Sequence, residues 1–472
     1  MTDEVCNCAS GDMLQIGMGA AQGSQTDREL NEASASFSAA ENNQIKHWYQ
    51  STTSDPSASH FTFDQFQKRT WQLSERFRHR LYREMCGHSK CGKDKVVTLK
   101  GCVITLKSLL VSPLSETAVS IVRLCTDEAM VPPLSRQQVL HFTADLVENY
   151  LSVESGSPEH ATWTFGGSVN DRHCLSTFLM HNMTSSDNSN GLTANDIEKW
   201  LSDTPLICTL LDALLRSVFC LKNYDDDLQL TCLPTPTLPF CLNVDWSRGN
   251  TVLCVSSLLL LNQHIPLQLR RQWRLAFNSV VHGESFTRLV SSVNGKGPCI
   301  LIVKDKDGFV FGGFCSTGLL LKPAFFGDER CFLFTLYPEM KIFAATGYNR
   351  NWVYFNCYQQ TMLNGLGFGG MNEATGMERD PRQFGLWIDA ELGSGWSRPS
   401  CTTYNSSLLS STETFQIDSL ELWFVGINPQ ASQQGEKQAA SILDVDPELK
   451  AMLTMTGRGN ASDGLRQDDT NS

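Results

Sequence analysis

Hydrophobic residues recur at the spacing of a helix face through most of the first half of the chain, from residue 37 to about 240. Ile45, Trp48 and Tyr49, for example, lie three and four positions apart, so that in a helix they share one side. The stretch 203–221 carries a broader stripe, in which several leucines stand beside Val218 and Phe219. The pattern predicts a helical region at 37–240, with helices at 43–50, 116–128, 136–151 and 203–221.

The pattern changes after a proline-rich stretch around Pro236, which we take as a domain boundary. One amphipathic helix is predicted at 265–280, because Trp273, Phe277 and Val280 would fall on one face. Short aromatic and β-branched runs follow, separated by Gly, Asn and Pro, and such runs are typical of strands. They lie at 299–303, 309–314, 331–336, 342–345, 352–355, 384–392 and 420–425. The second region therefore predicts stacked antiparallel sheets, and the chain as a whole belongs to the α+β class.

Both ends of the chain are polar. Residues 1–36 are rich in small and polar residues and predict a disordered tail. The tail 428–472 contains one predicted helix at 446–456, which begins with a capping carboxylate at Asp446 and a proline in its first turn. Leu449, Met452 and Leu453 share one face of it. So short a helix is not stable alone, so it docks on its own domain or on a partner, and we take these four residues as partner-binding candidates.

Composition narrows the classes of function. The chain has 472 residues, 41% of them hydrophobic, which is enough for packed cores. Its net charge of −12 argues against a general nucleic-acid binder. An odd number of cysteines, 17, behind an N-terminus without an apolar signal segment predicts free thiols in a reducing cytoplasmic compartment. The most apolar run, 251–261, is far shorter than the ~20 residues of a membrane-spanning helix, so any contact with a membrane is expected to be peripheral.

The stretch 68–83 is basic and also contains Trp71, Phe77 and Leu81, which offer an apolar stripe among the arginines. One interpretation is a surface for an acidic phospholipid or an acidic partner protein. The other is the solvated face of an ordinary helix, which the sequence favours.

Several short patterns resemble known sites. The segment 365–370 has the letters GxGxxG, but it lies among short strands, so glycines that permit close backbone packing explain it better than a nucleotide site. The segment 186–198 resembles a calcium loop with too few carboxylates, and 54–66 is a more degenerate version. We expect helix–loop–helix geometry there without a metal.

Two further groupings are weaker. Cys86 and Cys91, with His79 and His88 nearby, have a loose zinc-like spacing that lacks a second pair, so no metal site is predicted. Cys401 is a conceivable nucleophile with His282 as its base, but isolated Cys and His residues are usually structural. We therefore expect neither catalysis nor a cofactor.

Seven segments of the strand-rich half together resemble the TLDc domain family, over residues 244–427. They are Val310-Phe-Gly-Gly-Phe314, Arg330-Cys-Phe-Leu-Phe334, Thr346-Gly-Tyr-Asn349, Asn364-Gly-Leu-Gly-Phe-Gly-Gly370, Phe384-Gly-Leu-Trp387, Cys401-Thr-Thr-Tyr-Asn405 and Leu420-Glu-Leu-Trp423. The family positions within them are Gly312, Gly313, Gly347, Asn349, Gly367, Gly370, Trp387, Cys401, Tyr404 and Trp423. The segments 441–448 and 464–466 narrow the resemblance to a lysosome-linked branch associated with mTOR.

The resemblance implies a two-sheet antiparallel β-sandwich with flanking helices and no catalytic mechanism. It implies a non-enzymatic adaptor that binds subunits of the vacuolar-type proton ATPase and the mTOR complex, supports nutrient-responsive signalling, and associates with the lysosomal membrane from the cytoplasm. Thr2 departs from the N-terminal glycine that a lipid-anchored relative would use, and Gly19 would be exposed only by a start at Met18. The family also implies resistance to oxidation, and the alternative function is protection through a reactive thiol, for which Cys315, Cys331, Cys357 and Cys401 are available.

Overall fold

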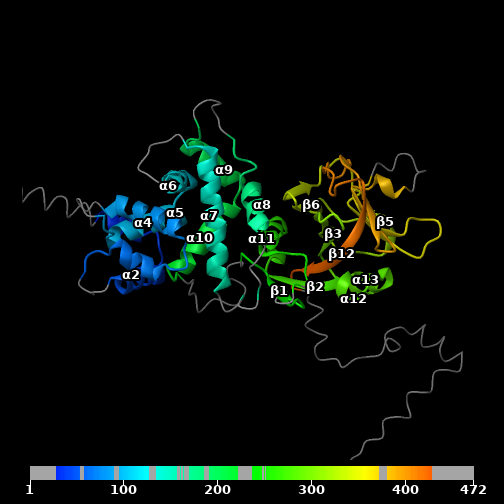
Figure 1. The fold of residues 1–472 in the computed structure, drawn as a ribbon, viewed down its shortest axis with the longest axis horizontal. Coiled ribbons are helices and arrows are strands. Elements are labelled where there is room, and N and C mark those ends of the chain that lie inside the picture. The colour runs from blue at the N-terminus through cyan, green and yellow to red at the C-terminus, as the bar shows by residue number, and fades with distance from the viewer. Residues whose placement is uncertain are drawn as a thin grey trace, which may run out of the picture. The chain divides into compact units, whose positions relative to one another are not determined.

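The computed structural model (Figure 1) describes residues 28–53, 58–89, 95–126, 134–156, 160, 163, 169–184, 191–221, 237–246, 249, 251–370 and 380–427. The predicted helix at 446–456, with Asp446, Leu449, Met452 and Leu453, lies outside the described residues. The first half is helical, as predicted, but the tail predicted at 1–36 is wrong in part, because residues 28–34 form helix and Ala33 is buried. Its helices are α2 (Ala39–Thr52), α3 (Phe63–Arg69), α4 (Glu75–Ser89), α5 (Leu99–Leu110), α6 (Leu114–Cys125), α7 (Arg136–Ser155), α8 (Val169–Leu179), α9 (Ala194–Asp203) and α10 (Leu206–Val218).

Helices α2 to α9 form two pairs of helix–loop–helix units. The loops before α3 and α5 are joined by a short antiparallel bridge, in which Phe61 and Val97 exchange backbone hydrogen bonds of 3.0 and 3.1 Å. The loops before α7 and α9 are joined in the same way by Leu134 and Leu192, at 2.9 and 2.7 Å. The helix–loop–helix geometry predicted from 54–66 and 186–198 is thereby confirmed. Their partner loops lack a calcium-like pattern, and the sequence did not reveal them.

Hydrogen bonds at the helix starts explain how these loops keep their shape. The residue after each bridge position is the N-cap of the next helix, and in three units the side chain three residues later accepts from the backbone N–H of that cap. In a calcium loop the equivalent last position is a glutamate that binds the ion with both oxygens. Here the three side chains instead complete capping boxes, because each accepts a hydrogen bond from the backbone N–H of its N-cap residue. The N–H of Thr62 donates to Gln65 at 2.8 Å, that of Ser135 to Gln138 at 2.8 Å and that of Thr193 to Asp196 at 2.9 Å.

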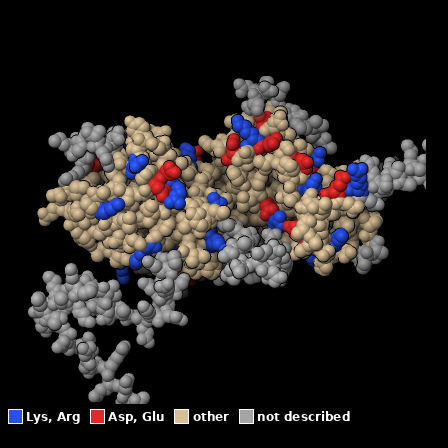
Figure 2. Space-filling model, turned by 180° about the vertical axis from the view of Figure 1, so that it is seen from behind, with Lys and Arg blue, Asp and Glu red and all other residues tan. Residues whose placement is uncertain are grey.

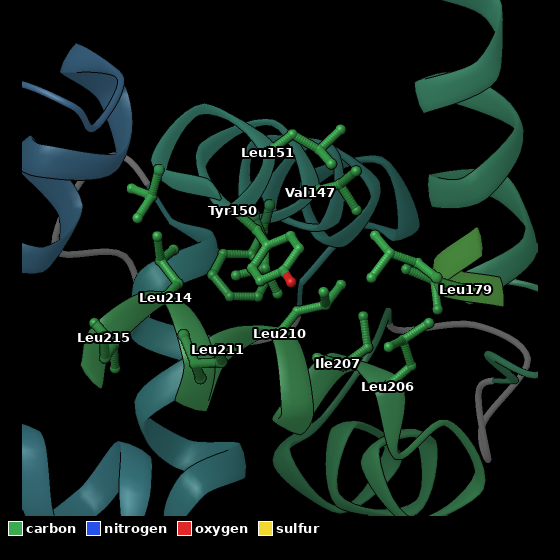
Figure 3. Packing of buried hydrophobic residues seen from close by; sticks show 14 of the residues in the cluster. Val147, Tyr150, Leu151, Leu179, Leu206, Ile207, Leu210, Leu211, Leu214 and Leu215 are labelled. Carbon is green, nitrogen blue, oxygen red and sulfur yellow. The ribbon is translucent and has the colours of Figure 1, made fainter. Parts of the chain in front are cut away.

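The core of the helical region lies between α7 and α10 (Figure 3). Val147 and Tyr150 of α7 face Leu210 and Leu214 of α10, and each of the four is at most 1% exposed. The leucine stripe predicted in 203–221 is thus buried. Truncating a leucine in such a core costs about 2–5 kcal/mol.

The basic stretch 68–83 follows the prediction only in part. Phe77 and Leu81 lie on the buried side of α4, at 1% and 0% exposure. Trp71, expected on the same stripe, lies in the turn before α4 and is 72% exposed. The stripe prediction is wrong at this residue, because the turn between α3 and α4 interrupts the helical periodicity there.

The second half begins with helix α11 (Val255–His264), which the sequence did not predict. Its strands are β1 (Phe240–Leu242), β2 (Gln272–Asn278), β3 (Cys299–Asp305), β4 (Val310–Cys315), β5 (Lys322–Phe326), β6 (Phe332–Tyr337), β7 (Lys341–Ala344), β8 (Val353–Asn356), β9 (Gly365–Phe368), β10 (Leu386–Asp389), β11 (Ser394–Ser397) and β12 (Thr414–Val425). Helices α12 (Ser279–His282) and α13 (Phe286–Val293) follow β2.

The strands form two layers that share strand β12. The order is β5-β8-β9-β10-β11-β12-β3-β4-β6-β7, and β2 pairs with the end of β12 and with β1. The first part of β12 pairs with β11, and its later part lies between β3 and β2. All pairings are antiparallel except that of β1 with β2, which is parallel.

Side chains from the two layers interleave in one core, as a β-sandwich requires. Leu301 and Leu333 of the β3-β4-β6 layer belong to the same buried cluster as Phe355, Phe368 and Ile388 of the β8-β9-β10 layer. The opposite face of β3, β4 and β6 packs against α11 and shares a core with the helices. The predicted fold class, a helical region followed by an antiparallel sandwich, is confirmed.

The helix predicted at 265–280 is wrong. The segment folds as a short 3₁₀ turn, then strand β2, then α12. Trp273, Leu275 and Phe277 alternate on its buried side, which allows the segment to pair with β12. Val280, expected on the buried face of a helix, is 75% exposed. Spacing alone fitted a helix because Trp273 and Phe277 are four residues apart, but the period of two prevails once a neighbouring strand is available.

Surface and membrane features are modest in the described residues. On the face shown in Figure 2, basic and acidic side chains are scattered among neutral ones and form no single large field. No described helix is long and apolar enough to cross a membrane alone. Helices α5 and α6 are long and apolar enough only when taken together, and a bend of 116° separates them.

Candidate functional site

Three of the family segments, far apart in the sequence, meet in one partly buried network of loops. The Asn349 side chain lies at its centre. Its amide nitrogen donates to the Gly370 carbonyl at 3.3 Å and to the Thr402 hydroxyl at 2.8 Å. Its amide oxygen accepts from the Thr403 hydroxyl at 2.9 Å and from the Asn351 backbone N–H at 3.1 Å. One asparagine therefore holds three loops in register, using its full hydrogen-bonding capacity.

Tyr404 and Cys401 complete this network from the same segment. The Tyr404 hydroxyl donates to the Trp352 carbonyl at 2.9 Å, and burial raises the pKa of the phenol well above its usual range. Cys401 is 1% exposed. Burial also raises the pKa of the Cys401 thiol, although surrounding backbone N–H groups act in the opposite direction. A thiol that stays protonated is a poor nucleophile.

The family glycines are sites of close approach by aromatic rings. A Cβ at Gly313 would lie 2.7 Å from the Phe368 ring, and one at Gly370 would lie 2.5 Å from Phe325. Gly367 is crowded in the same manner. Gly312 lies closest to the Leu301 backbone carbonyl and then to the Phe334 ring, whereas Gly347 has open space and a φ of +77°. Rings from both layers can approach the backbone only because these positions lack a side chain.

Trp423 marks a second buried polar centre, built around Glu421. The Trp423 indole donates to Glu421 at 2.8 Å, and the same carboxylate accepts from Val252 N–H at 2.7 Å and from the Thr251 hydroxyl at 2.8 Å. Asn278 donates to it at 3.3 Å. Burial raises the pKa of the Glu421 carboxyl, and these donors act against that shift. The sequence signal was present, as a single acid between leucines in an apolar strand, but its role was not predicted.

Trp387, by contrast, lies in a small separate cluster with Tyr354 and Phe384. Its indole donates to Asp389 at 3.0 Å. Each aromatic family position is therefore buried and hydrogen-bonded within the fold.

A cleft of about 710 Å³ lies next to the loop network, between the sandwich and the helices. One wall is the loop 400–407, in which Ser400 and Asn405 adopt left-handed backbone conformations (φ 57° and 46°) and the Ser400 N–H donates to the Ser406 carbonyl at 2.7 Å. The remaining walls come from the end of α8, the end of α11 and strand β7. The lining residues are Phe178, His181, Asn182, His264, Met340, Lys341, Ile342, Phe343, Ser400, Asn405, Ser406 and Ser407.

The polar side chains that line the cleft have the following contacts. The His264 ring nitrogen Nδ1 lies 2.8 Å from the Leu260 carbonyl, and burial lowers the pKa of this histidine, which favours the neutral ring. The Lys341 ammonium is paired with Glu339 at 2.7 Å. The buried Ser406 hydroxyl has no hydrogen-bond partner among the described residues. The sequence did not reveal this cleft, because its walls come from four separate segments without a shared motif.

The other predicted groupings are resolved by the contacts of their residues. His282 accepts the Asn278 backbone N–H at 3.0 Å, and among the described residues no contact joins it to Cys401. Gly365 and Gly367 lie inside strand β9, between β8 and β10, so they form a closely packed strand, as predicted.

The zinc-like and calcium-like patterns were predicted to bind no metal. His79 stacks on Phe63 with ring centroids 4.1 Å apart, and His88 lies 3.3 Å from Glu84. Cys91 lies outside the described residues, and no group of His, Cys, Asp or Glu suited to a metal ion occurs within them.

Comparison with known proteins shows that the loop network lies within a known type of domain. Residues 247–426 match the model of the TLDc domain. The MTOR-associated protein MEAK7 of Gallus gallus is 36% identical over 415 residues, which cover 84% of this chain and 85% of the chicken protein. The chain belongs to the TLDc-domain family.

Other TLDc proteins show how far the similarity extends. The MTOR-associated protein MEAK7 of Homo sapiens is 34% identical over 399 residues, which cover 81% of this chain and 83% of that protein. Nuclear receptor coactivator 7 of Homo sapiens is 34% identical over 181 residues, 36% of this chain and 18% of that protein. Similarity to the MEAK7 proteins therefore includes the helical region, whereas the coactivator resembles a much smaller part of the chain.

Proposed function

We propose that this chain is a non-enzymatic adaptor that associates with mTOR and supports nutrient-responsive signalling. The observation that carries the proposal is the 36% identity to MTOR-associated protein MEAK7 of Gallus gallus over 84% of the chain. That match covers 85% of the relative and extends over both the helical region and the TLDc domain, which supports a shared role.

The proposal extends to the vacuolar-type proton ATPase as a second partner and to the cytoplasmic face of the lysosomal membrane as the place of action. The family resemblance suggests both. The candidate contact is the predicted helix at 446–456, whose Leu449, Met452 and Leu453 form an apolar face. Inserting such a face into a groove contributes roughly 1.5–3 kcal/mol per side chain.

The alternative, protection through a reactive thiol, has less support. Cys315, Cys331, Cys357 and Cys401 are all buried. Burial raises the pKa of Cys315, Cys357 and Cys401, and the neighbouring Cys315 thiol is the first cause of the raised pKa of Cys331. Reactive cysteines need exposure and a lowered pKa, and these four have the opposite properties.

The test is affinity purification of the tagged chain from cells, with and without residues 441–472, followed by quantification of mTOR and ATPase subunits. A second variant replaces Leu449, Met452 and Leu453 by Asp. A matched control replaces Lys450 and Thr454, which lie on the other side of the predicted helix, by Asp.

We expect both partners to be recovered with the full chain and the control, and the ATPase to be lost with the truncation and the apolar-face variant. The thermal unfolding midpoint should stay unchanged in all four proteins. If the full chain recovers no mTOR, the proposed function is wrong. If the apolar-face variant instead lowers the unfolding midpoint by several degrees, the helix supports its own domain rather than a partner.

A further inference from the structure

The turn between α3 and α4 holds a tryptophan out into solvent. Trp71 is 72% exposed, whereas its neighbours Thr70 and Leu73 are 0% and 2% exposed. Large aromatic side chains are normally buried when a core is available. The core here is available, because the two flanking residues belong to it, so the exposure of Trp71 follows from how the turn is built.

Hydrogen bonds fix this turn from both sides. The Thr70 hydroxyl donates to the Phe66 carbonyl at 2.8 Å, and the Leu73 N–H donates to the Thr70 carbonyl at 3.0 Å. Helix α7 holds the other side: the Asn149 side chain accepts the Ser74 N–H at 2.6 Å. An ordered turn therefore presents Trp71, so inserting this side chain into another surface costs little conformational entropy.

The surroundings of Trp71 are basic, although the whole chain has a net charge of −12. Residues 64–80 contain five Lys or Arg and two Asp or Glu, a local excess of three positive charges. Lys68 and Arg69, at the end of α3, and Arg76, in the first turn of α4, are exposed. Arg76 and the buried Arg80 both approach the Asp145 carboxylate, at 3.9 and 3.1 Å.

This combination fits a membrane interface better than a protein partner. A stable protein interface needs roughly 1,000 Å² or more with several apolar residues at its centre and few lysines. Trp71 stands alone, and among the exposed charged residues within five positions of it, Lys68, Arg69 and Arg76 outnumber the acidic Glu75. Tryptophan is enriched at headgroup depth, and Lys and Arg close to a membrane attract anionic lipid.

We infer that the α3–α4 turn is a membrane-docking site, in which Trp71 inserts at the headgroup level of an anionic bilayer and Lys68, Arg69 and Arg76 contact lipid phosphates. The inference rests on the proposed membrane location but needs neither mTOR nor the ATPase. It is therefore tested on the purified chain alone.

The experiment is co-sedimentation of the full chain with vesicles of phosphatidylcholine, alone or mixed with phosphatidylserine, at low and at physiological salt. The variants are Trp71→Ala and Lys68→Glu. Their matched controls are Tyr348→Ala, which removes a 68% exposed aromatic side chain of the TLDc domain, and Lys46→Glu, which reverses an exposed charge on α2. Thermal unfolding of each protein accompanies the binding measurements.

We expect the wild type to bind the mixed vesicles more tightly than phosphatidylcholine alone, and less tightly as salt rises. Trp71→Ala should weaken binding roughly tenfold or more, and Lys68→Glu roughly fivefold or more. Both should keep the wild-type unfolding midpoint, since both side chains are exposed, and both controls should bind as the wild type does. Equal binding of Trp71→Ala and wild type, or no preference of the wild type for anionic vesicles, would overturn the inference while leaving the mTOR association untouched.

Discussion

Replacing Glu421 by alanine should destabilise the TLDc domain by about 3 kcal/mol, from the hydrogen bonds that the carboxylate accepts. The alanine variant leaves four donors without their acceptor, in Thr251, Val252, Asn278 and Trp423. Trp423 and Asn278 are 0% and 2% exposed, so water cannot replace the lost acceptor. Each buried donor left without it lowers the free energy of unfolding by about 1–3 kcal/mol. Thr251 and Val252 are only partly buried and recover some hydration, and removing a buried charge offsets part of the loss.

The assay is thermal unfolding of the full chain, followed by tryptophan fluorescence. For a domain of this size each kcal/mol shifts the midpoint by about 2–4 °C, so we expect a fall of roughly 6–12 °C. Glu421→Gln keeps the shape and one carbonyl oxygen, and should cost roughly half as much. A loss of less than ~1 kcal/mol in the alanine variant would refute the reasoning, because it would mean that the donors find other partners.

The pH dependence gives an independent check on the same residue. Burial raises the pKa of Glu421 in the folded state above its ordinary value of 4.5. Between these two pKa values the unfolded chain binds fewer protons than the folded one, so stability falls as the pH rises. The stability advantage of the wild type over Glu421→Gln should therefore shrink from pH 4.5 upward, until the pH exceeds the folded pKa.

Three further predictions concern other parts of the TLDc domain. Gly313→Ala should cost roughly 1–3 kcal/mol, because its Cβ would lie 2.7 Å from a buried ring, while Gly393→Ala, with nothing within 4 Å, should stay within ~0.5 kcal/mol of wild type in urea unfolding. An arginine hydrogen bond lowers the pKa of Asp328 to about 2, so Asp328→Asn should cost roughly 1 kcal/mol at neutral pH and remove the loss of stability that the wild type shows as pH falls from 3.8 to about 2. In native maleimide labelling followed by mass spectrometry, the exposed Cys220 should react quickly and the buried Cys401 only after unfolding; rapid labelling of Cys401 would revive the thiol hypothesis.

The sequence identified the helical region well where one side of a helix is strongly apolar. The stripe from Leu206 to Val218 is buried in α10 as expected. Prediction from the sequence failed where the spacings of a helix and of a strand both fit, as in 265–280, because the residues of β2 fit a helix until β12 is placed beside them. It also failed where a turn interrupts a pattern, as at Trp71. Strand existence in the sandwich followed from aromatic and β-branched runs, but β1, β5, β9 and β11 were missed, since each is only three to five residues long.

From the sequence, the site could be predicted only as a set of family motifs. The family segments gave Asn349, Cys401 and Tyr404 as important, and the structure shows that they meet. Nothing in the sequence could show that Asn349 joins three loops, since two of its four hydrogen bonds are to backbone groups, of Gly370 and Asn351. The cleft beside them was likewise invisible, because Lys341 and His264 come from elements that only the fold brings together.

Strand β12 gives the domain an unusual order of assembly. It is the last of the described strands to be synthesised, yet it pairs with β2, near the start of the domain, and it also connects the two layers. The earlier strands must therefore wait, with one edge unpaired, until almost the whole chain has left the ribosome, and such delayed non-local pairing makes folding slow and exposes it to aggregation. A nascent chain that ends between residues 397 and 413 contains every other described strand of the domain and still lacks the one that closes it. Chains terminated anywhere before β12 should thus be bound by chaperones or degraded by proteases, and should never form a smaller working domain.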